Sequence, residues 1–472
     1  MKNTPIRFTF LVVLGMITAQ AVRGQQASLP DTTAAHYQFV SQRLLQTGLQ
    51  QLGAFDILKE LISIAPKRMS GTPGFERAKD FAEAWMNRHG LDNVHPQPVV
   101  VPRWERGSVE SAFMLAAEGK TQRVPLSVCA LGGSIATPLR GIAAEILEVH
   151  SFDDLADKGT DAKGKIVFFN TPMDPTNIST RDAYRAVARY RTRGAAEASR
   201  LGAVAMLVRS MTLARDDVPH TGTQEFPSGA RHIPAAALGR SSADALAATI
   251  KEQPSVRVQL VLDCHPLEEG MSSNVIGEIK GSMAAKEIVL IGAHLDAWDV
   301  GNGAHDDGAG CAHVLEALNL LKQLGLKPHR TIRAVLFTNE EHGAHGAEAY
   351  AGAATQAGER HVAALESDPG GFAPRGFNLE TDSVTLLKYQ RWGRLFDGLN
   401  AGRITRGFTG TDIEPLVHSG VPGIGLDPEN HRYFDYHHSA NDTIDKVNPR
   451  ELEMGAIAIA LLSFMIAESG MD

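Results

Sequence analysis

The C-terminal half of the chain carries five His, Asp and Glu residues that are spaced as ligands of a metal centre. Their separations of 12 to 70 residues are far too wide for a zinc finger but natural for ligands collected from the ends of successive strands. The set could give each of two metal ions one imidazole and one carboxylate and leave one carboxylate to be shared. These donors suit zinc and need no thiolate. The residues are His294, Asp306, Glu341, Asp368 and His438.

The elements that must position these residues follow an α/β pattern after residue 268. The first strand is apolar throughout, as expected for a strand buried on both faces of a sheet. Polar, acidic or imidazole groups follow each strand, and open α/β sheets build their sites at the carboxyl ends of the strands. We therefore expect the five residues to meet there. The expected order is strand 288–293, helix 307–323, strand 331–337, helix 344–355 and strand 362–365.

The remaining chain divides into three stretches. Residues 37–105 predict two helices and a strand. Residues 106–267 change character, with short strands and one helix near 181–201. The final helix at 449–467 is apolar on all sides, and we expect it to be buried because it is too short to span a bilayer.

The first residues have the pattern of a cleaved secretory signal. Lys2 and Arg7 precede an apolar run at 8–17, and residues 19–21 supply the small side chains that a signal peptidase requires. The run is shorter than the roughly 20 residues that a spanning helix needs. We therefore predict a signal peptide at 1–24, a secreted or periplasmic protein, and no stable membrane anchor after cleavage.

The composition excludes several classes of protein. The 472 residues are 43% hydrophobic and 21% charged, which rules out a disordered or fibrous chain. Lys and Arg total 46 against 54 Asp and Glu, so we expect no nucleic-acid partner. The three cysteines are too dispersed for a clustered zinc motif. Cys129 and Cys264 could form a disulfide, whereas Cys311 falls in an apolar helical pattern typical of a core.

Five ordered motifs resemble the M28 family of co-catalytic zinc peptidases, and within it the carboxypeptidase Q branch. The resemblance implies a three-layer α/β/α sandwich with a mostly parallel central sheet, built from residues 25–105 and 268–472. Residues 106–267 resemble a protease-associated domain and would form a smaller, β-rich or α+β insertion. The motifs are GAHLD at 292–296, GAHDDGAG at 303–310, TNEEHG at 338–343, ESD at 366–368 and YHHSANDT at 436–443.

The resemblance also implies how the five ligands divide between two Zn²⁺ per chain. His294 and Asp368 would hold one zinc ion, Glu341 and His438 the other, and Asp306 would bridge them. Two such ions would polarise the scissile carbonyl and activate a water molecule. No serine or cysteine nucleophile is then required.

Three further residues receive catalytic roles from the same resemblance. Glu340 would be the general base, and Asp296 would orient His294. His437 stands where many family members have a tyrosine that assists the tetrahedral oxyanion, and it either takes that role or is an ordinary histidine beside the site. Family members often have a cis peptide after the bridging carboxylate, here between Asp306 and Asp307.

The predicted function is that of an exported di-zinc exopeptidase for dipeptides or short peptides with free termini. A domain inserted near the site could wall off both ends of the substrate. The alternatives are an aminopeptidase for longer peptides and an amidohydrolase for acylated amino acids. A receptor or scaffold is disfavoured because all five ligand positions and Glu340 are present. A short peptide is the expected partner, and a homodimer is left open.

Overall fold

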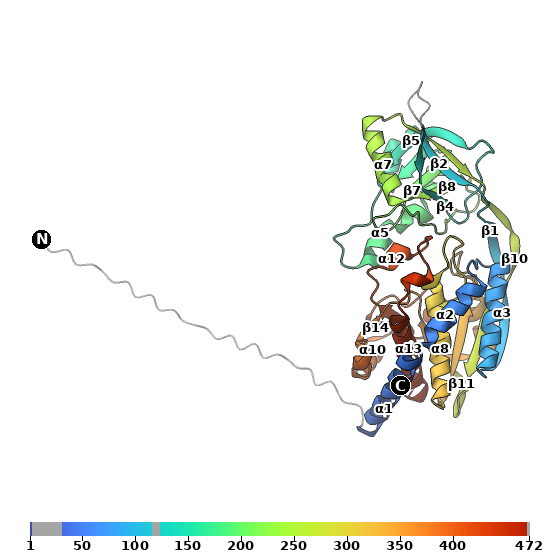
Figure 1. Cartoon of the computed structure of the whole chain (residues 1–472), viewed down its shortest axis with the longest axis vertical. Coiled ribbons are helices and arrows are strands. Elements are labelled where there is room, and N and C mark those ends of the chain that lie inside the picture. The colour runs from blue at the N-terminus through green and yellow to red at the C-terminus, as the bar shows by residue number, and fades with distance from the viewer. Residues whose placement is uncertain (2–30, 116–122, 470–472) are drawn as a thin grey trace.

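The computed structural model describes residues 1, 31–115 and 123–469, and apart from Met1 the predicted signal peptide lies outside them. Two eight-stranded sheets lie one above the other in Figure 1. The lower sheet has the strand order β1 (Asp92–Glu105), β10 (His265–Ile279), β12 (Arg330–Phe337), β11 (Ala284–His294), β13 (Arg360–Glu366), β16 (Gly423–Pro428), β14 (Pro374–Glu380) and β15 (Arg403–Arg406).

The centre of the lower sheet is parallel. Strand β11 pairs in parallel with both β12 and β13, and β13 pairs in parallel with β16. Strands β1, β10 and β14 join by antiparallel pairing towards the two sides. The carboxyl ends of the four central strands therefore meet at one edge, which is where open α/β sheets place functional groups.

Helices cover both faces of the lower sheet. Val289 and Ile291 of β11 belong to the apolar cluster on one face of the sheet, and Leu290 belongs to the cluster on the other face. Since neighbouring residues of a strand point to opposite faces, the apolar run of β11 is buried on both faces of the sheet. The predicted α/β/α sandwich is confirmed. The first face carries α1 (Asp31–Gln51), α2 (Gly53–Ile64), α3 (Pro73–Arg88), α8 (Ala309–Gln323) and α13 (Pro449–Ser469), and the second carries α9 (His345–Ala357) and α11 (Glu414–His418).

The N-terminal stretch contains three helices where the sequence predicted two. Leu52 adopts a left-handed conformation with φ 54° and separates α1 from α2. Helix α3 begins as expected, since Pro73 occupies its first position and the Thr72 hydroxyl accepts a hydrogen bond from the Phe75 N–H at 3.3 Å. The left-handed break at Leu52 was missed because leucine favours helix interiors.

Helix α13 is the candidate for a membrane span within the part of the chain that the structure describes. Its most apolar window has a mean hydropathy of 1.6, and 83% of that window is buried inside the protein. The helix packs in the core of the lower sheet with α8 and α1. The prediction of a buried core helix is confirmed.

The chain leaves the lower sheet along β1 and returns along β10. These two strands pair antiparallel from Asp92 with Glu278 to Glu105 with His265, and the upper sheet is built between them. The domain boundaries predicted at 106 and 267 remain a prediction, and the strand ends lie beside them. The upper sheet has the order β3 (Arg123–Leu126), β2 (Glu110–Leu115), β9 (Arg257–Leu262), β5 (Ile142–Val149), β6 (Ile166–Phe169), β7 (Ala205–Arg209), β8 (Ala235–Leu238) and β4 (Val128–Ala130).

The helix expected near 181–201 is two helices that meet at Arg193. The first of them, α5, lies between the two sheets in Figure 1, next to the short helix α12. The helices of this part are α4 (Phe152–Lys158), α5 (Thr180–Thr192), α6 (Gly194–Arg200) and α7 (Arg240–Glu252), and the short elements near the lower sheet include α10 (Ser383–Gln390) and α12 (Tyr433–Tyr436).

The cysteines are free thiols. Cys129, Cys264 and Cys311 are all buried, and none of them forms a disulfide. The disulfide considered between Cys129 and Cys264 is therefore absent. The Cys129 Sγ lies 3.0 Å from Nη1 of Arg106 instead. Arg106 also forms an ion pair with Asp299 at 2.7 Å, which joins the upper part of the chain to the loop after β11. Cys311 packs in the core, as predicted.

Candidate metal centre

The five predicted ligands converge at the carboxyl edge of the lower sheet. His294 is the last residue of β11, Glu341 follows β12, and Asp368 follows β13. Asp306 lies in a short irregular turn at Ala304–Gly308, and His438 lies just after α12. Parallel neighbours bring segments that are far apart in the chain to one edge. The predicted convergence is therefore observed, while the roles of the individual residues remain a prediction.

Asp306 lies between two histidine-containing groups. Its Oδ1 is 3.2 Å from Nε2 of His294, which in turn is 3.7 Å from Oδ1 of Asp368. Its Oδ2 is 3.2 Å from Nε2 of His438, which is 2.9 Å from Oε2 of Glu341. The two oxygens of the Asp306 carboxylate therefore face different histidine–carboxylate groups, as the oxygens of a bridging ligand must.

The electrostatics of the cluster favour a bound cation. Burial lowers the pKa of His438, but the carboxylates of Glu341 and Asp306 outweigh burial and raise it to about 10. Burial also lowers the pKa of His294, but the carboxylates of Asp306 and Asp368 outweigh it and raise this pKa well above the usual value. The field of these carboxylates thus draws protons onto both imidazoles, and divalent cations would neutralise the same charge. Glu341 Oε1 is also buried without a hydrogen-bond partner, which leaves a donor oxygen for a metal.

The turn that carries Asp306 is fixed by a second carboxylate. Asp442 accepts hydrogen bonds from the main-chain N–H of His305 at 2.7 Å and of Asp306 at 3.1 Å. The expected cis peptide joins Asp306 to Asp307. The Asp307 carboxylate accepts a hydrogen bond from the main-chain N–H of His294 at 3.1 Å. The turn and the end of β11 are therefore tied together.

Arg68 is a structural residue that the sequence did not reveal. Its guanidinium is fully buried and donates to the carbonyl oxygens of Leu295 at 2.7 Å, Asn302 at 2.6 Å and Gly303 at 2.7 Å. These carbonyls span the loop between His294 and Asp306. Because arginine is mostly found at the surface, its residue type gives no signal of a buried role.

Asp296 supports the site through two different groups. Its main-chain oxygen lies 3.0 Å from Nδ1 of His294, whereas its carboxylate Oδ1 is 3.9 Å from that atom. The carboxylate instead accepts hydrogen bonds from the main-chain N–H of Glu340 at 3.2 Å and of Glu341 at 3.4 Å. Asp296 therefore contacts His294 through its main-chain carbonyl and not, as predicted, through its carboxylate. The carboxylate of Asp296 instead holds the segment that contains Glu340, the proposed base.

Glu340 and His437 both line the pocket above the cluster. Burial raises the pKa of Glu340 to about 8; nearby His294 opposes the shift, and Glu341 and Asp368 add to it. The His437 ring stacks on that of His438 with centroids 3.5 Å apart, and its Nε2 lies 3.7 Å from Oδ2 of Asp306. Burial, with the neighbouring His438, lowers the pKa of His437 well below its usual value.

The upper part of the chain reaches the cluster through a short segment at 220–223. The Thr221 N–H donates to the carbonyl oxygen of His438 at 2.9 Å, and the Thr221 carbonyl lies 3.3 Å from Nδ1 of His438. His220 Nδ1 lies 2.7 Å from the carbonyl oxygen of His437. A hydrogen bond at Nδ1 leaves Nε2 of His438 free to face a metal.

The pocket over the cluster has a volume of about 270 Å³, near the small end for ligand pockets. The sequence analysis missed most of its wall. Helix α5 shows arginines at helical spacing, a visible signal, but nothing in the sequence says that they face the metal cluster. The missed lining residues are Arg181, Tyr184, Arg185, Arg191, Thr223, Phe408, Thr411, Tyr433 and Phe434.

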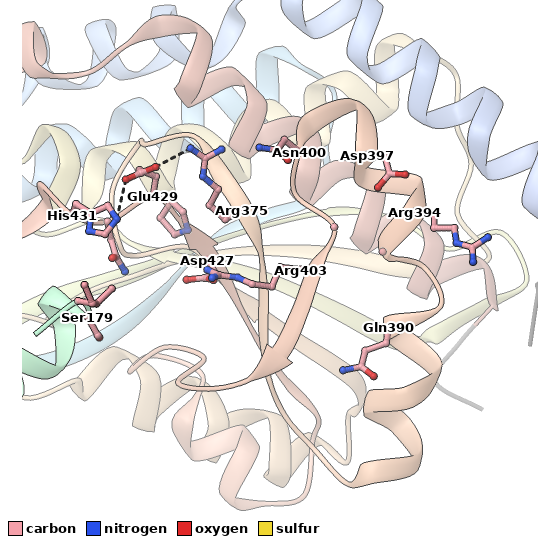
Figure 2. Close-up of a pocket in the computed structure, with 15 residues that line it drawn as sticks. Ser179, Arg375, Gln390, Arg394, Asp397, Asn400, Arg403, Asp427, Glu429 and His431 are labelled. Atoms are coloured by element: carbon pink, nitrogen blue, oxygen red, sulfur yellow. Dashed lines mark hydrogen bonds and ion pairs between the residues drawn. The ribbon is translucent and has the colours of Figure 1, made fainter. Parts of the chain in front are cut away.

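A larger cavity of about 1000 Å³ lies elsewhere, beside β14, β15 and β16 (Figure 2). Its charged groups largely neutralise one another: Arg375 pairs with Glu429 at 2.8 Å, and Arg403 pairs with Asp427. Within the described ranges, both residue sets that could hold a metal lie at the other pocket, which all their members except His294 line. They are Asp306, His437 and His438, and His294, Asp306 and Asp368. Size alone therefore does not mark the functional site.

An open α/β sheet with buried imidazoles and carboxylates at the carboxyl ends of its strands defines a metal-dependent enzyme. Comparison with known proteins specifies the family. The model of peptidase family M28 matches residues 274–463. Carboxypeptidase Q of Bos taurus is 36% identical over 437 residues, which cover 92% of this chain and 90% of the relative. Human carboxypeptidase Q is 36% identical and covers 89% of this chain and 86% of its own length.

Solved structures agree with this relationship. The crystal structure of a peptidase M28 precursor from Shewanella amazonensis is 35% identical, has a TM-score of 0.88, and covers 92% of this chain and 97% of its own. A zinc aminopeptidase from Bacillus subtilis shares the fold at 19% identity and a TM-score of 0.63, covering 88% and 95%. The chain therefore belongs to peptidase family M28, and it is a zinc metallopeptidase.

Proposed function

We propose that the protein is an exported di-zinc exopeptidase that hydrolyses dipeptides or short peptides with free termini. The observation that carries the proposal is the shared Asp306 carboxylate, which lies between two histidine–carboxylate groups in a pocket of about 270 Å³. His294 and Asp368 would hold one zinc ion, and Glu341 and His438 the other. When bound, zinc polarises a carbonyl and makes a water molecule more acidic.

The residues around the cluster would then divide the remaining work. Glu340, which lines the pocket but is not needed as a ligand, takes a proton from the attacking water and passes it to the leaving amine. Asp296 holds the main chain of Glu340 in place. A neutral His437 donates an N–H to the oxyanion that develops on the scissile carbonyl.

The limit on substrate length rests on the walls of the pocket. Helix α5 and the segment at 220–223 both come from the upper part of the chain and reach the same pocket as the ligand cluster. We expect a site walled on this side to accept a short peptide better than a long one. Charged termini inside it need protein partners, and a blocked terminus leaves those partners unpaired at a cost of about 1–3 kcal/mol each.

The direct test combines metal analysis with a substrate series. Purified protein should contain close to two zinc ions per chain, and chelation should abolish an activity that added zinc restores. An unblocked dipeptide should be cut, its acetylated and amidated forms should lose about tenfold or more in kcat/KM, and a pentapeptide should be poor.

Each alternative function predicts a different result. Equal kcat/KM on the pentapeptide and the dipeptide would favour an aminopeptidase with an open groove. Preference for an acylated amino acid would favour an amidohydrolase. Export is tested separately by determining the N-terminus of the secreted protein. An N-terminus near residue 25 would support the signal peptide, and an intact N-terminus would contradict it.

A further inference from the structure

Helix α5 is docked against the metal-bearing part of the chain in a fixed orientation. The Thr180 hydroxyl, at its first residue, donates to the carbonyl oxygen of Asn430 at 3.1 Å. One turn later, the Tyr184 ring stacks on Phe434 with centroids 4.4 Å apart and planes inclined by 18°. Phe434 belongs to α12, which lies next to α5 in Figure 1. These contacts set which face of α5 points into the pocket.

That face presents two arginines to the pocket. Arg181 lies three residues before Tyr184 and four residues before Arg185, and these are the spacings of residues that share one side of a helix. Their guanidinium carbons lie 5.1 Å and 5.0 Å from the centre of the Phe408 ring, another residue of the pocket wall. Cation–π contact with one ring orients both groups without using their N–H donors.

These two guanidinium groups have no carboxylate or hydrogen-bond partner within residues 31–115 and 123–469. Arg189 differs, because it lies outside the pocket lining and 3.1 Å from the Tyr190 hydroxyl. Arg191 also lines the pocket, and its Nη1 lies 3.4 Å from the Thr221 carbonyl while its Nε has no hydrogen-bond partner among the described residues. Across the pocket, the carboxylates of Asp306, Asp368 and Glu341 face imidazoles and are the proposed metal ligands. The arginines therefore form the cationic side of the pocket, and Glu340 is the one lining carboxylate, among the described residues, that is neither a proposed ligand nor paired with an imidazole.

We infer that Arg181 and Arg185 bind a carboxylate of the substrate while the scissile carbonyl lies at the metal cluster. The inference rests on the proposed peptidase function and names its specificity-determining residues. A guanidinium group matches a carboxylate with two parallel N–H···O bonds, which lysine cannot reproduce. The small pocket favours the terminal carboxylate of the residue after the scissile bond, although an acidic side chain there offers the same chemistry.

The test compares matched substrates on the zinc-loaded protein. Ala-Leu and Ala-Leu-amide differ only in the terminal carboxylate, and Ala-Glu-amide and Ala-Gln-amide differ only in a side-chain carboxylate. Wild type should favour Ala-Leu over its amide by about tenfold or more in kcat/KM. In Arg181→Gln/Arg185→Gln this ratio should fall to about one, with little change for the amide. Unchanged hydrolysis of the amide also reports that the variant is folded.

Two controls make the result specific. Arg189→Gln changes an exposed arginine of the same helix that lies over Phe152 and Tyr190 rather than in the pocket, and it should keep the wild-type ratio. In the Glu340→Gln background, which should retain metal but not turn over, the affinity for Ala-Leu should drop by about tenfold when both arginines are replaced. That affinity is measured by calorimetry and is independent of turnover.

The outcomes separate the two proposals. A wild type that cuts no peptide of the series contradicts the proposed function itself. A wild type that prefers Ala-Leu, with the same preference in the double variant, overturns the arginine assignment and leaves the function standing. A preference for Ala-Glu-amide over Ala-Gln-amide that disappears in the double variant supports the assignment and identifies the side chain as a carboxylate source.

Discussion

The two parts of the chain that meet at the pocket hold their functional side chains in different ways. On the metal-bearing side, His294 and Asp306 are buried and each is fixed by a main-chain or carboxylate partner. On the side of the upper sheet, Arg181 is partly exposed, Arg185 is exposed, and both rest on Phe408. Groups that perform a reaction need fixed geometry. Long arginine side chains that are partly exposed keep rotamer freedom and can adjust to a ligand. The contrast agrees with a division between the proposed reaction on one side and the proposed recognition on the other.

The separation is incomplete at one place. Thr221 belongs to the upper part of the chain, yet it contacts His438, a proposed ligand, through both its N–H and its carbonyl. Trp298, from the loop after β11, packs closely against Gly132 of the upper part and lies 5.7 Å from the His438 ring, measured between ring centroids. The upper part thus also helps to position one ligand.

The largest loss is expected from Asp306→Asn. An amide cannot supply two anionic oxygens, so both metal groups should weaken at once and peptidase activity should be abolished. Elemental analysis should show fewer than two zinc ions per chain. Asp445→Asn, an exposed carboxylate outside the cluster, is the control and should keep wild-type metal content. Normal zinc content in Asp306→Asn would mean that the carboxylate does not bridge.

The next largest effect separates the base from its neighbouring ligand. Glu340→Gln preserves size and leaves the proposed ligands intact, so zinc content should hold while kcat falls by roughly two to four orders of magnitude. Glu341→Gln should instead lose zinc, because Glu341 lies 2.9 Å from His438 in the same group. Retention of most of the wild-type kcat in Glu340→Gln would make the base assignment wrong.

The sequence predicted the metal-bearing side far better than the recognition side. Its strands are apolar runs that end in the ligands, and parallel strands necessarily share an edge, so the convergence of His294, Glu341 and Asp368 followed from local patterns. Arg68 could not be predicted, because it reaches its loop from a distant segment through main-chain carbonyls. Arg181 and Arg185 have visible helical spacing, but their direction depends on how α5 docks.

A smaller effect tests whether the upper part positions His438. A Cβ at Gly132 would lie 2.0 Å from Cη2 of Trp298, so Gly132→Ala must displace this ring or its own segment. Because Gly132 is also paired with Gly222, beside Thr221, we expect kcat/KM to fall roughly 10- to 100-fold. Gly352→Ala, where a Cβ has nothing within 4 Å, is the control. Wild-type kcat/KM in Gly132→Ala would confine the upper part to recognition.

The smallest effect on activity, with a clear effect on stability, concerns buried carboxylates on the metal-bearing side that no metal would neutralise. Glu453 of α13 is fully buried, and its Oε2 accepts a hydrogen bond from the Ala54 N–H at 2.9 Å. Burial raises the pKa of Glu453 to about 8, and nearby Glu316, also buried, adds to the shift. The folded state therefore binds this proton more tightly than the unfolded state, in which the pKa is near 4.5.

For an acid whose pKa is raised by folding, the stabilisation is complete below the unfolded pKa and is lost as pH rises through the folded pKa. The stability of the wild type should therefore decline between about pH 4.5 and pH 8 because of Glu453. Glu453→Gln keeps an oxygen for the Ala54 N–H but cannot ionise. At pH 9 it should be more stable than the wild type by on the order of a few kcal/mol, and this gain should shrink towards pH 5. Urea unfolding at both pH values measures the difference, with the partly exposed Glu451→Gln on the same helix as the control. An equal difference at both pH values would show that Glu453 does not titrate on unfolding, and that the buried carboxylates outside the cluster carry no charge penalty.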